Sequence, residues 1–152
     1  MDVKVINAML KSLVKVFNET IHSKVELGRP EISKELAKGY DLVTVVGYNG
    51  NMEGNLVYGF TSELGLLIVS KMMGGMPYEK LDELAMSAIG ELGNMVSGNI
   101  AMHLEQIGKP IDITPPSVIC GREIQINVEG LILKIPAQLE TLSFEVNMVM
   151  RE

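Results

Sequence analysis

Hydrophobic positions recur with helical spacing at the start of the chain and again in its middle. Residues 2–27 carry apolar side chains three or four positions apart, and this run closes with a Gly-Arg-Pro sequence at 28–30. Gly accepts the left-handed conformation that follows a helix and Pro cannot continue one, so the sequence predicts a long helix here. A second run, 82–107, begins with Asp82 as a capping residue and closes with Gly-Lys-Pro at 108–110. The pattern therefore predicts two long helices.

Between and after these helices the pattern changes to runs rich in strand-forming residues. Residues 41–48 and 52–60 flank an Asn-Gly-Asn sequence at 49–51, which predicts a hairpin because Asn and Gly tolerate positive φ. Residues 31–40 carry weak signals for both strand and helix. A short helix is expected from a cap at Thr61 or Ser62 through Met73, and strands are expected at 111–120, 122–128, 130–136 and 142–150.

The chain contains a weak internal repeat. A shift of 80 residues superimposes the two long helical runs and the Gly-x-Pro sequences that follow them, and a shift of 76 aligns Glu53-Gly54 with Glu129-Gly130. Two copies of a helix followed by strands predict an α+β, pseudo-symmetric two-half domain whose long helices pack on a largely antiparallel sheet. Coincidence is the competing explanation, since the identical positions are few. No linker divides the chain, so residues 1–152 are expected to form a single domain.

Composition narrows the classes of function. Thirteen basic and nineteen acidic side chains give a net charge of -6, the wrong sign for a protein that binds a phosphate backbone. Cys120 is the only cysteine, which disfavours the oxidised secreted class. No apolar run approaches the roughly 18 residues of a membrane span, and no cluster of metal ligands stands out. We expect a cytoplasmic protein that binds neither nucleic acid nor a membrane.

The second long helix leaves one narrow polar strip on an otherwise apolar surface. At about 100° per residue, the members of this strip fall within roughly 100° of one another. They are Glu83, Ser87, Gly90, Glu91, Asn94, Gly98, Ala101 and Glu105. The remaining circumference is apolar, which indicates more burial than a simple surface helix has.

Three glycines in this helix need an explanation, because each costs about 1 kcal/mol relative to Ala. Gly90 and Gly98 lie on the strip, where the absence of side chains would bare Glu91 and Asn94 to an incoming surface. Gly93 lies off the strip and is expected to let another helix pack closely. The alternative interpretation is a solvated polar edge whose glycines serve close packing alone.

Glu91 and Asn94 lie about one turn apart on the same face, so both can enter one partner's cleft. Asn does not titrate and is therefore no general base, but its amide can hold a water molecule for attack. Such positioning is the main protein contribution to phosphoryl transfer. Glu91 could anchor a Lys or Arg of the partner.

These residues resemble the CheC/CheX/FliY family of bacterial chemotaxis phosphatases. The resemblance is carried by DELAMSAIGELGNMVSGNIAM at 82–102, by Thr-Pro-Pro at 114–116 and by MMGGMPY at 72–78, and the layout is most similar to CheX. The family motif is an Asp or Ser, a Glu, an Asn and a more distant Pro. Its counterparts in this chain are Ser87, Glu91, Asn94 and either Pro115 or Pro116.

The resemblance implies an enzyme that hydrolyses the aspartyl phosphate of a CheY-like receiver domain, the phosphorylated part of a response regulator. Asn94 would orient the attacking water and Glu91 would engage the receiver's lysine, with Ser87, Gly90, Gly98, Pro115 and Pro116 as binding positions. The Mg²⁺ would belong to the receiver, so no cofactor or metal of the protein's own is expected. Relatives of this type are implied to be homodimers joined at sheet edges.

The first long helix lacks the Glu and Asn pair. The 80-residue shift places Lys11 and Val14 at the corresponding positions, so one site per chain is expected. Two other hypotheses remain open at this point. One is a non-catalytic adaptor that binds receivers through the same helix, and the other is a structural dimerisation domain with a solvated polar strip.

Overall fold

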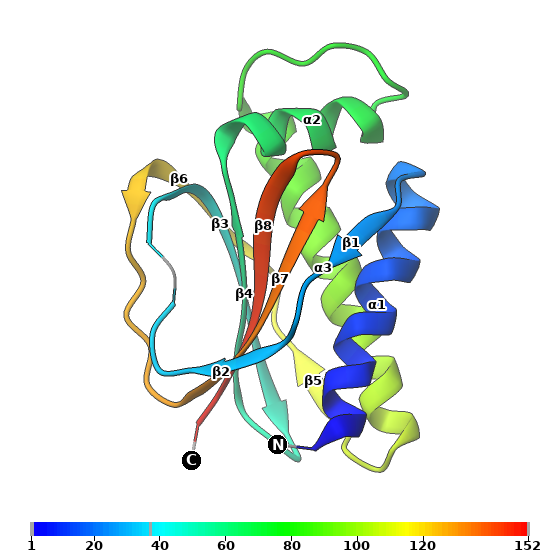
Figure 1. The fold of residues 1–152 in the computed structure, drawn as a ribbon, viewed down its shortest axis with the longest axis vertical. Coiled ribbons are helices and arrows are strands. Elements are labelled where there is room, and N and C mark those ends of the chain that lie inside the picture. Colours follow the sequence, from blue (N-terminus) through cyan, green and yellow to red (C-terminus); the bar gives the residue numbers. More distant parts are fainter. Residues whose placement is uncertain (1, 37, 152) are drawn as a thin grey trace.

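A computed structural model describes residues 2–36 and 38–151, and in this part of the chain three helices pack against an eight-stranded antiparallel sheet, two long ones on one face and a short one across its end (Figure 1). The elements in chain order are α1 (Val3–Ile21), β1 (Val25–Leu27), β2 (Glu31–Ser33), β3 (Tyr40–Gly50), β4 (Gly54–Phe60), α2 (Ser62–Met72), α3 (Glu83–Gln106), β5 (Ile111–Ile113), β6 (Ser117–Ile124), β7 (Leu131–Leu139) and β8 (Leu142–Met150). The predicted α+β class is confirmed.

The two halves of the chain interlock in the sheet. The strand order is β1-β7-β8-β4-β3-β5, with β2 also on β7 and β6 also on β3. Each half contributes a long helix, two strands and a hairpin. The first two strands of each half pair with the outer hairpin strand of the other half, and β4 pairs with β8 at the centre. This arrangement has the predicted pseudo-symmetry.

The sequence shifts that suggested the repeat are only partly right. The equivalent strands β1 and β5 begin at Val25 and Ile111, so the spacing between the halves is no longer 80 residues after the helices. The shift of 76 is coincidental, because Gly54 begins β4 whereas Gly130 precedes β7, and the counterpart of β4 is β8.

The first long helix ends earlier than predicted. α1 stops at Ile21, and His22 adopts the left-handed conformation, with φ 51°, while its N–H donates to the carbonyl of Phe17. Residues 25–27 form β1 instead, because Val25 pairs with Leu139 at the sheet edge. Gly28 is therefore no helix cap: its N–H donates to the carbonyl of Pro136 at 2.7 Å.

The other predicted elements agree with the structure at their boundaries or nearly so. Thr61 caps α2 and Asp82 caps α3, and the predicted hairpin joins β3 and β4 with Tyr48 opposite Gly54. Its turn lies at 51–53 and not at the Asn-Gly pair, because Asn49 and Gly50 extend β3 and pair with β5. The ambiguous segment contains the three-residue strand β2. The strand predicted at 111–120 is divided into β5 and β6, since the prolines at 115 and 116 have no N–H to donate to a ladder. Residues 125–128 are not strand.

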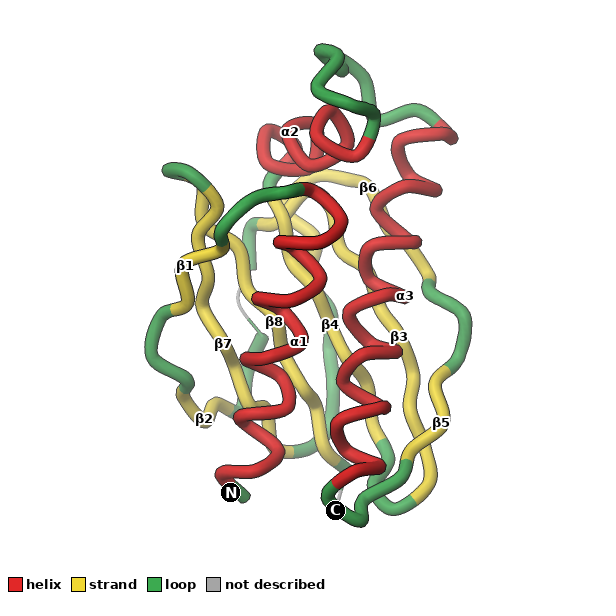
Figure 2. Tube along the Cα trace, turned by 90° about the vertical axis from the view of Figure 1, so that its right-hand side faces the viewer, coloured by secondary structure: helices red, strands yellow, loops and turns green. Residues whose placement is uncertain are grey.

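α1 and α3 lie side by side on the sheet and run in opposite directions (Figure 2). α1 packs beside β1, and α3 packs over β3, β5 and β6. The main core lies between these helices and the sheet, where the stacked rings of Phe17 and Phe144 are 5.3 Å apart.

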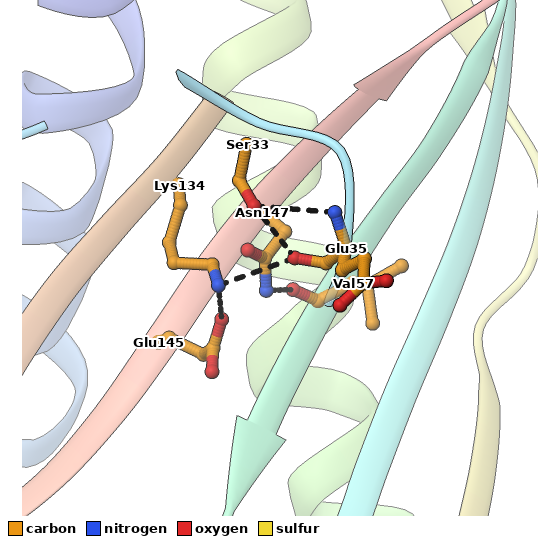
Figure 3. A network of polar contacts seen from close by, with 6 residues as sticks. All are labelled: Ser33, Glu35, Val57, Lys134, Glu145 and Asn147. Atoms are coloured by element: carbon orange, nitrogen blue, oxygen red, sulfur yellow. Dashed lines mark hydrogen bonds and ion pairs between the residues drawn. The ribbon is translucent and has the colours of Figure 1, made fainter. Parts of the chain in front are cut away.

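The opposite face of the sheet carries no helix among the described residues. A small apolar cluster around Val43 and Ile132 is covered there by the chain between β2 and β3 and by the chain after β6. Lys134 Nζ lies 3.6 Å from Glu145 Oε2 and donates to the carbonyl of Glu35, which holds the covering segment to the sheet (Figure 3).

Candidate functional site

One side of α3 is held tightly to the sheet. A Cβ added at Gly93 would lie 2.8 Å from Cγ2 of Thr44 on β3, so only Gly permits this approach. One turn later, the hydroxyls of Ser97 and the fully buried Tyr58 are 2.7 Å apart, and burial raises the pKa of Tyr58 above its ordinary value. The predicted role of Gly93 is corrected accordingly, because it packs against a strand and not against another helix. These contacts fix the rotation of α3 about its axis.

The rotation places the polar strip on the solvent side. Ser87 and Glu91 are exposed, and Asn94 and Gly98 are half-buried. The ion pairs found among the described residues, Lys71–Glu140 and Lys134–Glu145, do not involve Glu91. The Glu91 carboxylate thus faces solvent without a cationic partner from the described chain, one turn from the amide of Asn94.

The Thr-Pro-Pro segment between β5 and β6 lies beside this strip. Thr114 is tied to β3 twice, because its N–H donates to the carbonyl of Gly47 and its hydroxyl accepts from the Gly47 N–H, both at 2.9 Å. A Cβ added at Gly90 would lie 3.7 Å from Cγ of Pro116. Pro116 therefore packs on α3 next to Glu91, and Pro115 is exposed one residue earlier. The structure brings the distant proline and the helix motif together.

The two glycines of the strip have different surroundings. Gly90 is buried, and a Cβ there would come within 3.2 Å of Val118, so this glycine lets β6 approach the helix. The expectation that Gly90 bares the neighbouring head groups is wrong for this reason. Gly98 has no neighbour within 4 Å of an added Cβ, so the space above it is open. Gly98 fits the prediction of an uncovered strip.

The start of α3 is held by a contact that sequence reasoning missed. The Tyr78 hydroxyl donates to both carboxylate oxygens of Asp82, at 2.9 and 3.1 Å, while Asp82 accepts the N–H of Ala85 at 2.9 Å. The bond from Ala85, followed by that from Tyr78, lowers the pKa of Asp82, and the bond to Asp82 raises the pKa of Tyr78. No periodicity or spacing signals a tyrosine that reaches a cap from outside the helix.

The candidate site is an exposed helix face. Depressions of about 480 and 500 Å³ lie elsewhere, one beside Lys34 and Arg151 and the other beside Glu31 and Pro136. Within the described residues no group of three or more His, Cys, Asp and Glu could hold a metal ion, and no helix is long and apolar enough to span a membrane. Small molecules favour concave sites, so this face suits a protein partner.

Comparison with known proteins assigns the family. A family model described as "Chemotaxis phosphatase CheX" matches residues 42–136, a segment that contains the strip and both prolines. The chain is also 47% identical over 136 residues to the CheY-P phosphatase CheX of Thermotoga maritima, covering 90% of this chain and 88% of that protein. The chain belongs to the CheX family.

Solved structures agree with the CheX assignment. A CheC-like superfamily protein from Shewanella sp. PV-4 superimposes with a TM-score of 0.90 at 29% identity, over 100% of both chains. A structure of a CheX–CheY–BeF3–Mg²⁺ complex from Borrelia burgdorferi matches with a TM-score of 0.82 at 28% identity, over 97% of each chain. The fold is thus that of the CheC and CheX proteins.

Proposed function

We propose that the protein accelerates hydrolysis of the aspartyl phosphate on a CheY-like receiver domain and so controls chemotaxis signalling. The observation that carries the proposal is the pair Glu91 and Asn94, which lie one turn apart on the solvent face of α3. Membership of the CheX family supports it, as do a relative named CheY-P phosphatase and another solved in a complex with CheY.

Asn94 is the residue that positions water. Its amide oxygen accepts a hydrogen bond from a water molecule and its NH₂ group can donate one, so the water oxygen is directed at the phosphorus atom. Attack forms a bond from this oxygen to phosphorus, and the bond from phosphorus to the aspartyl oxygen breaks. The proton that the water loses passes to an oxygen of the phosphoryl group, inorganic phosphate leaves and the receiver's carboxylate is restored. Positioning of this kind lowers the activation free energy by several kcal/mol, and by roughly 7–11 kcal/mol at best.

Glu91 binds the receiver's lysine and thereby places Asn94. A charge-assisted hydrogen bond between a carboxylate and an ammonium group is about twice as strong as a neutral one. Ser87, Gly98, Pro115 and Pro116 form the rim of contact, and Gly90 acts through the packing of Pro116. The Mg²⁺ belongs to the receiver, and the protein supplies no cofactor of its own.

Further parts of the same proposal concern assembly. The protein is one CheX-like domain over residues 1–152, carries one site per chain, lies in the cytoplasm and forms a homodimer. No Glu precedes an Asn by three positions within α1, which supports the single site.

The edges of the sheet support the homodimer, because edge strands readily pair with another chain. Ile32 on β2 is 50% exposed and Ile119 on β6 is 41% exposed at the ends of the sheet, which supports pairing between copies.

The test uses a receiver domain from the same organism, phosphorylated with acetyl phosphate. We expect the wild-type protein to shorten the phosphate half-life. Asn94→Ala should abolish the acceleration and retain binding, because the amide acts on water and not on the receiver. Glu91→Ala should weaken both, because it removes the anchor.

Two results would contradict the proposal. An unchanged half-life with detectable binding would favour the adaptor, which binds receivers through α3 without catalysis. An unchanged half-life without phosphorylation-dependent binding would exclude both functions. Lys38→Ala serves as the control variant, since Lys38 is exposed in the segment between β2 and β3, away from α3.

A further inference from the structure

The solvent face of the helical layer has separated charges. α1 carries Lys4, Lys11 and Lys15, all exposed, and spacings of seven and four residues place them in one row along the helix. The acidic residue of α1 is Glu19. α3, in contrast, carries three Glu and neither Lys nor Arg. In a chain of net charge -6, this lysine row is a concentration of positive charge beside an acidic helix.

The lysine row runs along the side of α1 that adjoins α3, the helix that carries Glu91 and Asn94. Lys4 and Lys11 line a depression of about 220 Å³ together with His103 of α3. At the other end of α1, the Thr20 hydroxyl contacts the sulfur of Met95 at 3.9 Å. The two helices are antiparallel (Figure 2), and Lys15 falls between Lys11, which lies near His103, and Thr20, which contacts Met95, so it lies beside the part of α3 between Met95 and His103.

A partner seated on the site would also cover part of this row. A standard protein interface buries about 800 Å² on each partner, a patch roughly 30 Å across. Asn94 and His103 are separated by about 14 Å along the helix axis, at 1.5 Å per residue. Neighbouring helix axes lie about 8–10 Å apart. A receiver centred on Glu91 and Asn94 therefore reaches Lys15, and Lys11 lies at the edge of the patch.

We propose that Lys11 and Lys15 bind the acidic surface that surrounds the phosphorylated aspartate of the receiver. This proposal rests on the proposed function. An aspartyl phosphate with its Mg²⁺-binding carboxylates carries concentrated negative charge, to which the lysine row is complementary. Glu91 binds a cation of the receiver and the lysines attract its anions, so the charges of the two helices together steer the receiver to the encounter that brings its phosphate to Asn94.

Charges at the rim of an interface act on encounter more than on the bound state. The lysine row should therefore affect the association rate and KM, and leave kcat unchanged. Salt should reduce its effect, since the Debye length falls from about 30 Å at 0.01 M to about 8 Å at 0.15 M ionic strength.

The experiment compares two double variants with equal charge change. Lys11→Glu with Lys15→Glu reverses the row, and Lys34→Glu with Lys38→Glu reverses two exposed lysines in the segment between β2 and β3. Dephosphorylation of a receiver phosphorylated with acetyl phosphate is measured from 25 to 300 mM NaCl. Affinity is measured separately with a receiver that carries BeF₃⁻ and Mg²⁺ in place of the phosphoryl group, so that binding is observed without hydrolysis.

We expect the row variant to lower kcat/KM about tenfold at low salt, to leave kcat at saturation unchanged and to flatten the salt dependence. The control should stay within about twofold of the wild type. Circular dichroism confirms that each variant is folded, and Lys11→Gln with Lys15→Gln, which removes charge without adding repulsion, should show a smaller loss of the same kind.

The inference is overturned if both double variants change KM equally, or if the row variants change only kcat. Its failure is distinguishable from failure of the proposed function. If Asn94→Ala abolishes hydrolysis and the row variants behave as wild type, only the role of the lysine row is wrong. If the wild type binds without hydrolysis, the affinity measurements still decide the role of the row.

Discussion

Three glycines within one helix serve three different surroundings. The absence of a side chain lets β3 approach the helix at Gly93 and lets the segment of Pro116 and Val118 approach it at Gly90, whereas Gly98 faces open space. Each of these glycines lowers the stability of the helix by about 1 kcal/mol relative to Ala. For Gly93 and Gly90 the cost is offset by close packing against the sheet. For Gly98 no neighbour lies within 4 Å of an added Cβ, so close packing does not offset the cost.

Substitution by Ala separates these roles. Gly98→Ala should raise the free energy of unfolding by about 1 kcal/mol, because the methyl group meets nothing and the helix propensity improves. Gly93→Ala should lower it by about 1–3 kcal/mol, because the new Cβ meets the fully buried Thr44 at 2.8 Å. Urea denaturation measures both. A stabilised Gly93→Ala would show that the helix shifts away from β3 without cost.

At the scale of the element, α3 positions the site through contacts at its start and along its inner side. Asp82 caps the helix and is itself held by Tyr78, and Ser97 contacts Tyr58 four residues beyond Gly93.

α1 shows how a helix can end before its pattern of apolar residues does. Val25 continues the helical spacing of apolar residues, yet the chain turns at His22 and Val25 joins the sheet.

The cap should make the stability of α3 depend on pH. The pKa of Asp82 is lowered in the folded protein, so its carboxylate stabilises the fold above the unfolded value near 3.8, and the effect disappears as the pH falls through the lower folded value. Asp82→Ala should therefore destabilise the protein at pH 7 and much less near pH 2. Asp82→Asn should destabilise the protein less than Asp82→Ala at pH 7, because the amide oxygen can still cap the helix. Thermal unfolding at several pH values tests this, and a constant difference between wild type and Asp82→Ala would contradict it.

For the whole molecule, the important feature is the exchange of strands between the two halves. β1 and β2 pair with β7, whereas β5 and β6 pair with β3. The central pair, β4 and β8, also joins the halves. Either half alone would leave long strands with unpaired backbone groups and an uncovered apolar face, both of which cost free energy in water.

Fragments test this interdependence. We expect residues 1–80 and 81–152, expressed separately, to lack cooperative thermal unfolding and slow amide exchange, and the intact chain to unfold in one transition. An equimolar mixture of the fragments should regain some of the native signal if they associate. A folded, monomeric 81–152 fragment would show that α3 and its site do not need the other half.

Much of the architecture follows from the sequence because local rules decide it. Capping residues place α2 and α3, the two strand-forming runs at 41–48 and 52–60 predict the hairpin of β3 and β4, and the amphipathic pattern of α3 already separates Glu91 and Asn94 from the core. The Glu and Asn spacing within its sequence context also indicated the family to which the chain belongs.

Only the tertiary structure decided what depends on distant partners. The proximity of Pro116 to Gly90, the buried state of that glycine and the reach of Tyr78 to Asp82 are contacts between separate elements, and no periodicity encodes them. The end of α1 and the exchange of strands are of the same kind, since pairing with β7 overrides a helical pattern at Val25. The single polar strip was readable from the sequence because it lies on one helix. The position of the lysine row next to α3 became apparent only from the packing of α1 against α3.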